Sequence, residues 1–178
     1  EARKQYEEYR KLEIAGKYDE ALKLIERVLE TRQKLLGPDH ISVADAVTGL
    51  ALVYHDKGEY AKAEPLFLRA LSIVERARGP EHTDVGHSVF NLANLYYYKS
   101  EYAKAEPLYG RALTIWEKNL GPEHRLVAYA LHGLSLIYGD KGDYARAEEY
   151  CQRALTIWEK VLGPENPRVA TALTNLAS

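Results

Sequence analysis

Residues 102–124 read YAKAEPLYGRALTIWEKNLGPEH, and near copies of this stretch stand at a fixed distance on either side of it. The copy that starts 42 residues earlier, at Tyr60, reads YAKAEPLFLRALSIVERARGPEH, and the copy that starts 42 residues later, at Tyr144, reads YARAEEYCQRALTIWEKVLGPEN. A weaker copy, YDEALKLIERVLETRQKLLGPDH, starts at Tyr18. A fixed period of about 20–50 residues is typical of proteins built from stacked supersecondary units. The sequence therefore predicts a solenoid, in which each unit contacts only its neighbours.

The copied stretch has the pattern of one amphipathic helix. Ala105, Tyr109 and Trp116 recur at helical spacing and define an apolar face. The pair Gly121-Pro122 is expected to end this helix, because glycine suits the left-handed position after a helix and proline cannot continue it. The same pair recurs in every copy, so each repeat is predicted to contain a helix that ends at the same point.

A second apolar stripe lies between each Gly-Pro pair and the next copy. Its residues are spaced by four, three and four positions, which places them on one face of a helix. The stripe consists of Val43, Val47, Leu50 and Tyr54, then Val85, Val89, Leu92 and Tyr96, then Val127, Leu131, Leu134 and Tyr138. Each repeat is thus predicted to be a pair of antiparallel helices, and the fold class to be all-α.

Residues 89–112 contain V-x-x-L-A-x-x-Y followed by A-x-x-x-Y-x-x-A, which resembles the tetratricopeptide repeat signature. The usual repeat has about 34 residues, whereas this one has 42. That period, the NLA-x-LY block at Asn91, the AEPL block at Ala105 and the LGP-[DE]-H loop together resemble the repeats of kinesin light chains. The resemblance implies a right-handed superhelical solenoid that acts as a scaffold for protein partners.

We expect a single array over residues 1–178. It would have an N-terminal capping repeat at 1–42, full repeats at 43–84, 85–126 and 127–168, and a truncated first helix of a further repeat at 169–178. In the capping repeat the stripe positions hold Glu1, Gln5 and Glu8, which predicts a helix over residues 2–15 that forms a polar lid; a frayed segment is the alternative. The chain lacks methionine and ends within a stripe, so we expect an excised or engineered fragment.

Composition excludes several classes of function. The net charge of -2 favours neither nucleic acid nor an anionic membrane as a partner, and no apolar run approaches the length of a membrane span. Cys151 is the only cysteine, so no disulfide framework is expected, and a reducing compartment, the cytoplasm, is the default expectation. Cys151 occupies the same repeat position as Phe67 and Tyr109, which indicates a buried structural thiol.

Neither catalysis nor metal binding is predicted. The chain has no nucleophile elbow, phosphate loop or zinc-protease motif, so we expect no enzyme and no cofactor. His40, His82 and His124 share one inter-repeat loop position. Equivalent helices of successive repeats lie roughly 16–20 Å apart, too far for the three histidines to hold one metal ion. Their expected role is a contact in the loop or at the start of the next helix.

The resemblance implies that the first helices line a concave groove that receives a peptide. By repeat position, the predicted groove residues are Gly49, Leu52, His55, His87, Asn91, Asn94, Tyr97, Tyr129, His132 and Gly133, with Arg10, Asp45, Thr48 and Leu136 beside them. Asn91 and Asn175 match the asparagine with which the family grips peptide backbone. An asparagine offers both a donor and an acceptor for that task. The alternative is that the groove is merely solvated surface.

Two features of this predicted groove break the repeat. Tyr97 and Tyr98 stand where the other repeats have His-Asp or Gly-Asp. Glycine alternates with asparagine at one first-helix position, with Gly49 and Gly133 as the glycines. Glycine within a helix lowers stability by about 0.5–1 kcal/mol relative to alanine. The glycines at this position therefore need a structural or functional explanation. Either helices pack closely there, or a bound chain lies over the glycines.

The predicted function is protein–protein interaction through a peptide in the groove. The alternative is a structural module that stacks end to end without a dedicated peptide ligand. Self-association through the terminal helices would follow from the apolar stripe Val169, Leu173 and Leu176, which lacks a partner helix in the sequence.

Asn91→Ala is predicted to weaken binding of a peptide by about 1–2 kcal/mol, as for a lost buried hydrogen bond. The melting temperature should change little, because the side chain is expected to face solvent in the free protein. Titration of a library-selected peptide against wild type and variant, with thermal melts of both, tests this. Equal affinities, or a large loss of stability, would rule the assignment out.

Overall fold

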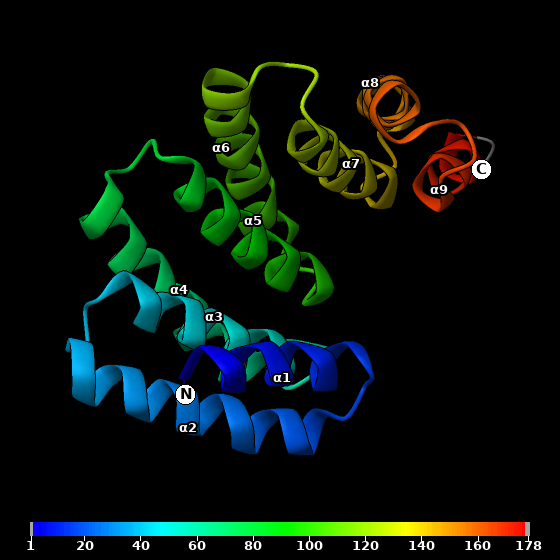
Figure 1. Ribbon diagram of the computed structural model, residues 1–178. Helices are drawn as coiled ribbons and strands as arrows, with labels where there is room; N and C mark the ends of the chain where they lie inside the picture. Colours follow the sequence, from blue (N-terminus) through cyan, green and yellow to red (C-terminus); the bar gives the residue numbers. More distant parts are fainter. Residues whose placement is uncertain (1, 177–178) are drawn as a thin grey trace. The chain divides into compact units, whose positions relative to one another are not determined.

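The computed structural model describes the backbone of residues 2–176 and the side chains of residues 4–174. Within these residues the regular structure is entirely helical, which confirms the all-α class (Figure 1). The helices are α1 (Ala2–Ile14), α2 (Tyr18–Leu36), α3 (Ile41–Asp56), α4 (Tyr60–Arg78), α5 (Thr83–Tyr98), α6 (Tyr102–Leu120), α7 (Arg125–Asp140), α8 (Tyr144–Leu162) and α9 (Pro167–Leu176).

The chain divides into two compact units, Glu1–Pro80 and Glu81–Ser178. In the first unit each helix from α1 to α4 packs on the next one, and in the second unit each helix from α5 to α9 does the same (Figure 1). This is the neighbour-to-neighbour packing expected of stacked helical pairs. The boundaries of a single array over residues 1–178 and its right-handed superhelix stay predictions.

Each second helix begins at the predicted tyrosine and ends at the predicted Gly-Pro pair. The terminal glycines, such as Gly121 with φ 88° and ψ 157°, have the expected positive φ. The prediction that they adopt the left-handed helical conformation is wrong, because ψ is extended. The following proline disfavours helical values of ψ for the residue before it. The resulting combination is essentially restricted to glycine.

Histidine starts each full first helix, as predicted. The ring Nδ1 of His40 accepts a hydrogen bond from the backbone N–H of Ser42 at 3.1 Å. His82 and His124 make the equivalent bond at 3.1 Å and 3.2 Å. Each satisfies one of the backbone donors that a helix leaves unpaired at its N-terminus. The described residues contain no cluster of three or more side chains suited to hold a metal ion.

The predicted stripes form the core of each unit. In the second unit Val85, Val89, Trp116 and Trp158 are buried, so both tryptophans are packing residues. In the first unit Tyr9 lies in a buried cluster with residues of α2 and α3. The helix predicted for the N-terminal segment is present, but it also contributes this buried tyrosine and is therefore more than a polar lid.

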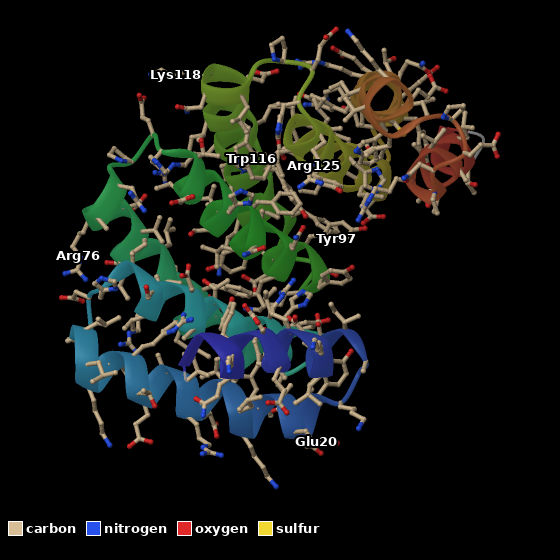
Figure 2. All side chains as sticks on the ribbon, viewed as in Figure 1. Glu20, Arg76, Tyr97, Trp116, Lys118 and Arg125 are labelled. Carbon is tan, nitrogen blue, oxygen red and sulfur yellow. The ribbon has the colours of Figure 1, made fainter. Side chains whose placement is uncertain are left out.

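One ion pair per repeat joins the loop before a hairpin to the second helix of that hairpin. Arg76, labelled in Figure 2, contacts Asp39 at 2.7 Å, and Lys118, also labelled there, contacts Glu81 at 2.5 Å. Lys160 contacts Glu123 in the same way at 2.5 Å. These pairs are exposed, so they contribute little stability.

The last helix, α9, exposes part of its stripe. Leu173 is 49% exposed, whereas Val89 and Leu131 at the same repeat position are fully buried under α6 and α8. Val169 is buried, because the face it shares with Ala172 packs on α8. Of the predicted uncovered face, Val169 is thus covered and Leu173 is exposed. Leu176 and Asn175 lie outside the residues whose side chains the structure describes.

Trp116 and Trp158 differ in the hydrogen bonding of their indole N–H groups because of one small residue in the facing helix. A Cβ on Gly86 would lie 2.4 Å from the indole nitrogen of Trp116, so only glycine fits there. The indole N–H donates to the carbonyl oxygen of Thr83 at 3.4 Å. Ala128 occupies the equivalent position in the next repeat, and the buried indole nitrogen of Trp158 has no partner. The methyl group of Ala128 explains the difference, because it occupies the space that Trp116 uses.

Gly86→Ala is expected to lower the free energy of unfolding by about 1–3 kcal/mol, the usual range for an overpacked core. The added methyl group would force Trp116 away from Thr83. Gly110→Ala on α6 is the matched control, since its Cβ would meet nothing within 4 Å. That change should stabilise by about 0.5–1 kcal/mol. Urea unfolding measures both, and equal responses would contradict the packing account.

Candidate functional site

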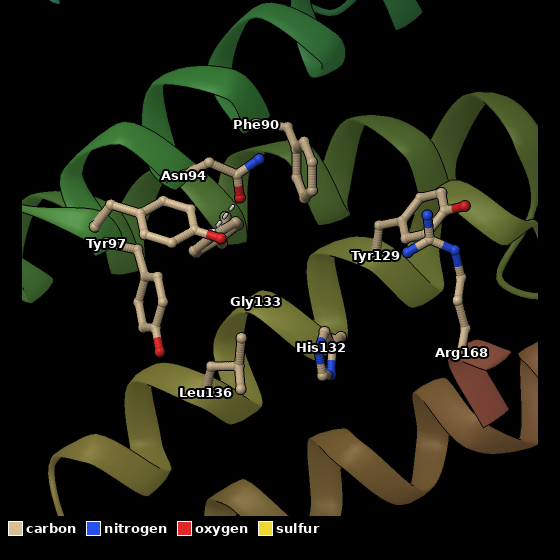
Figure 3. A pocket seen from close by; sticks show the side chains of 10 residues that line it. Phe90, Asn94, Tyr97, Tyr129, His132, Gly133, Leu136 and Arg168 are labelled. Carbon is tan, nitrogen blue, oxygen red and sulfur yellow. Dashed lines mark hydrogen bonds between the residues drawn. The ribbon is translucent and has the colours of Figure 1, made fainter. Parts of the chain in front are cut away.

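The second unit contains a pocket of about 460 Å³, lined by side chains of α5, α6, α7 and α9 (Figure 3). Its lining consists of Phe90, Asn94, Tyr97, Tyr98, Tyr109, Tyr129, His132, Gly133, Leu136 and Arg168. Half of the ten predicted groove residues are thus brought together here: Asn94, Tyr97, Tyr129, His132 and Gly133. We call this site the aromatic pocket.

The floor of the aromatic pocket is the ring of Tyr109, which lies over Gly133. A Cβ on Gly133 would lie 2.5 Å from this ring. The Tyr109 hydroxyl donates to the amide oxygen of Asn94 at 2.5 Å, the dashed line in Figure 3. Burial raises the pKa of Tyr109, so the hydroxyl stays a donor. Because this bond uses the amide oxygen, Asn94 can still offer N–H donors to a ligand.

A connected set of aromatic rings forms one wall of the pocket. The ring of Phe90 contacts those of Tyr109 at 5.6 Å, Trp116 at 5.4 Å and Tyr129 at 6.4 Å, measured between centroids. Tyr129 in turn contacts Trp158 at 5.8 Å. Phe90 and Tyr109 meet edge to face and the other pairs are tilted, and aromatic rings at these distances attract each other. The wall is therefore preformed rather than assembled by a ligand.

One end of the pocket carries a positive charge. The guanidinium of Arg168 lies 4.6 Å from the ring centroid of Tyr129, within the range of a cation–π contact (Figure 3). Among the described residues no carboxylate pairs with this guanidinium. The α9 end of the pocket thus disfavours other cations.

His132 lies next to this end and is held neutral. Its ring meets Trp158 edge to face at 5.3 Å, and its Nδ1 atom is buried without a hydrogen-bond partner. Burial, and to a lesser extent the charge of Arg168, lowers the pKa of His132 below its ordinary value. Protonation would place a second charge beside Arg168 in a partly buried site.

Tyrosines occupy the opposite end of the pocket. The ring of Tyr97 lies 5.6 Å from Tyr98 and 5.8 Å from Tyr102. The Tyr102 hydroxyl donates to the Asp140 carboxylate at 2.9 Å. Burial, followed by a hydrogen bond to Asp140, raises the pKa of Tyr97. The residues that break the repeat, Tyr97 and Tyr98, are therefore both part of the pocket.

The other predicted residues lie elsewhere. In the second unit, Asn91 is half-buried rather than facing solvent, and His87 contacts the Trp116 ring at 5.3 Å; neither lines the pocket. In the first unit, Leu52 is half-buried and the His55 ring nitrogen lies 3.1 Å from the Asp56 carboxylate. The role of these residues in binding stays a prediction.

The two glycines have a packing explanation. A Cβ on Gly49 would lie 3.1 Å from the ring of Tyr9, whose hydroxyl donates to the Gly49 carbonyl oxygen at 3.1 Å. Gly133 lies under Tyr109 in the same manner. Tyr109 therefore requires a glycine at 133, and Tyr9 packs tightly against Gly49, whether or not a ligand binds.

Sequence reasoning missed three pocket residues, Phe90, Tyr109 and Arg168, and it singled out Tyr98 as breaking the repeat without assigning it to the groove. Tyr109 was assigned to the framework because its position repeats as an apolar residue, and Arg168 falls outside the stripes. Tyr98 carried a signal, since it breaks the repeat next to Tyr97. Phe90 could have been found as an aromatic one helical turn before Asn94.

The described helices include none that is long and apolar enough to cross a membrane. A family model described as tetratricopeptide repeat matches residues 12–64, 42–118, 87–150 and 128–178. No curated protein matches the chain in sequence.

Solved structures similar to this chain include repeat proteins of the kinesin light chain type. The nearly identical TPR-like repeats of a Podosopora anserina protein assigned as a kinesin light chain are 27% identical, with a TM-score of 0.81 over 98% of this chain and 83% of that one. BtubC (BKLC) from P. vanneervenii is 25% identical, with a TM-score of 0.82 over 94% of this chain and 67% of that one. The Bacillus subtilis aspartyl phosphate phosphatase F shares the fold at 16% identity, with a TM-score of 0.83 over 98% of this chain and 44% of that one.

His132 is expected to make stability depend on pH. Its pKa is lowered in the folded state, so the unfolded chain binds more protons once the pH falls through the unfolded value of about 6.5. Stability is therefore lost as the pH falls through that value. His132→Phe, which copies Phe90 at the same position, should flatten the decline in melting temperature between about pH 7.5 and 5.5. Identical pH profiles would show that His132 titrates normally.

Proposed function

Because the chain belongs to the tetratricopeptide repeat family, whose members mediate protein–protein interaction, we propose that the second unit binds a segment of a protein partner in the aromatic pocket. The observation that carries this proposal is the pocket itself. It combines a preformed aromatic wall with free N–H donors on Asn94.

The size and chemistry of the pocket suit a peptide. About 460 Å³ accommodates one bulky apolar side chain together with adjacent backbone. Phe90, Tyr109 and Leu136 would contact the side chain, while the Asn94 amide would donate to a backbone carbonyl of the segment. Tyrosine-rich surfaces are favoured for such contacts, because each ring offers apolar area with a polar tip.

A catalytic role is not part of this proposal. The tetratricopeptide fold is typically a non-catalytic scaffold. Among the pocket-lining residues, the ring of His132 packs on Trp158 and the guanidinium of Arg168 on Tyr129. The Ser135 hydroxyl donates to the backbone carbonyl oxygen of His132 at 2.8 Å rather than to its ring, so this pair is not arranged as a nucleophile and its base. Since Cys151 is buried and unpaired, we place the function in a reducing compartment such as the cytoplasm.

End-to-end assembly is the second candidate function. It is supported by Leu173 on α9, which is half-exposed where the equivalent residues of α5 and α7 are covered by the next helix. Sedimentation over a range of concentrations separates the candidates. Assembly requires association that Leu173→Glu abolishes, whereas peptide binding requires no association.

Leu136→Trp is expected to weaken binding of a library-selected peptide at least about tenfold, because the larger ring fills the pocket. The control is Leu68→Trp on α4, an exposed position in the first unit. It should bind like wild type. Calorimetric titration gives the affinities, and thermal melts show whether each variant is folded. A folded Leu136→Trp variant with wild-type affinity would refute the assignment of the peptide to this pocket.

A further inference from the structure

The tyrosine end of the aromatic pocket differs from every other repeat position in the chain. Tyr97 and Tyr98 end α5, and Tyr102 begins α6. Their rings meet at centroid distances of 5.6 Å and 5.8 Å, and Tyr98 is 59% exposed. The faces and edges of three rings are thus gathered at the surface. Such clusters attract cations, because the face of an aromatic ring carries partial negative charge.

Asp140 places a carboxylate beside these rings. It accepts a hydrogen bond from the Tyr102 hydroxyl at 2.9 Å and faces the hydroxyl of Tyr97. Asp56 holds the same repeat position in the first unit, but there the neighbouring His55 lies 3.1 Å from the carboxylate. In the second unit Gly139 replaces that histidine, and a Cβ on Gly139 would meet nothing within 4 Å. The position beside Asp140 is therefore open.

The cations of the surrounding helices already have partners. Lys99 and Lys104 both contact Glu101 at 2.6 Å. Lys141 contacts Glu106 at 2.7 Å, and Arg146 pairs with Asp143. Among the described residues, the carboxylate of Asp140 has tyrosine hydroxyls as partners and no cation.

Helix termini add to the negative potential at this end. α5 ends at Tyr98 and α7 ends at Asp140, and the C-terminus of a helix carries partial negative charge. The opposite end of the pocket carries Arg168. A cation is thus attracted to one end of the pocket and repelled from the other.

We propose that Tyr97, Tyr98, Tyr102 and Asp140 form a subsite for a lysine or arginine side chain of the bound partner segment. The rings contact the apolar stem and the charged group, and Asp140 supplies the counter-charge. This subsite deepens the proposed function, since it takes the partner to be a peptide. It also sets the direction of the segment, with the basic residue at the α5 and α7 C-termini and away from Arg168.

The test uses small probes before any peptide is known. Nα-acetyl-lysinamide and Nα-acetyl-argininamide carry the cationic side chains, and Nα-acetyl-norleucinamide is the neutral analogue of the lysine probe. Nuclear magnetic resonance of tyrosine ring signals follows each titration at constant ionic strength. The cationic probes should give saturable shifts at Tyr97, Tyr98 and Tyr102, and the norleucine probe should bind at least about twofold to fivefold more weakly.

Matched variants assign the contributions of charge and rings. Asp140→Asn keeps an acceptor for Tyr102 but removes the charge, and Tyr98→Leu keeps apolar area but removes a ring. Each should weaken the cationic probes about twofold to fivefold. Asp56→Asn, at the same position in the first unit, should leave these titrations unchanged. Thermal melts confirm that the variants remain folded.

The outcomes separate the subsite from the proposed function. No saturable shift, equal binding of the norleucine probe, or full binding by a folded Asp140→Asn variant would overturn the subsite. A selected peptide that binds wild type and loses affinity in Leu136→Trp but not in Asp140→Asn would leave the pocket assigned and refute the cationic subsite. Cationic probes that bind while peptide selection fails would support the subsite and refute the peptide.

Discussion

Tyr109 lying on Gly133 is the contact on which the second unit depends, because it decides both how closely α6 approaches α7 and what the pocket floor is. The ring occupies the space of a glycine Cβ, which would lie 2.5 Å away. The hydroxyl then reaches Asn94 on α5. One side chain thereby links three helices. The ring of Trp116 packs on Gly86 in the same way. Tyr9 on Gly49 is the counterpart in the first unit.

The same contacts explain how a repeat framework acquires a site. A solenoid needs only the residues that recur, so function resides in those that differ between repeats. Around Tyr109 the differing residues are Asn94, Tyr97, Tyr98 and Arg168, each unlike the residue at its position in the adjacent repeat of this unit. The framework holds them on rigid helices, which limits the entropy that a ligand must overcome on binding.

Charge is distributed unevenly along the pocket. Arg168 stands at one end without a carboxylate partner among the described residues, and Asp140 stands near the other with tyrosine hydroxyls as its partners. Most other charges on the described helices are neutralised by neighbours one helical turn or one repeat away. Where a protein leaves opposite charges unpaired at the two ends of a pocket, a ligand is oriented as well as bound.

Periodicity by itself determined the helices, their limits and the all-α class, because each repeat contains the same apolar pattern and the same Gly-Pro pair at the end of its second helix. The resemblance to tetratricopeptide repeats, mapped by repeat position, implied Asn94, Tyr97, Tyr129, His132 and Gly133 as groove residues. The tertiary structure decided what the pattern leaves open. Whether Gly133 accommodates a ligand or a ring depends on the approach of α6, and the partner of Asn94 comes from another helix. Likewise the extended ψ of Gly121 follows from the proline after it, a local constraint that a repeat period does not encode.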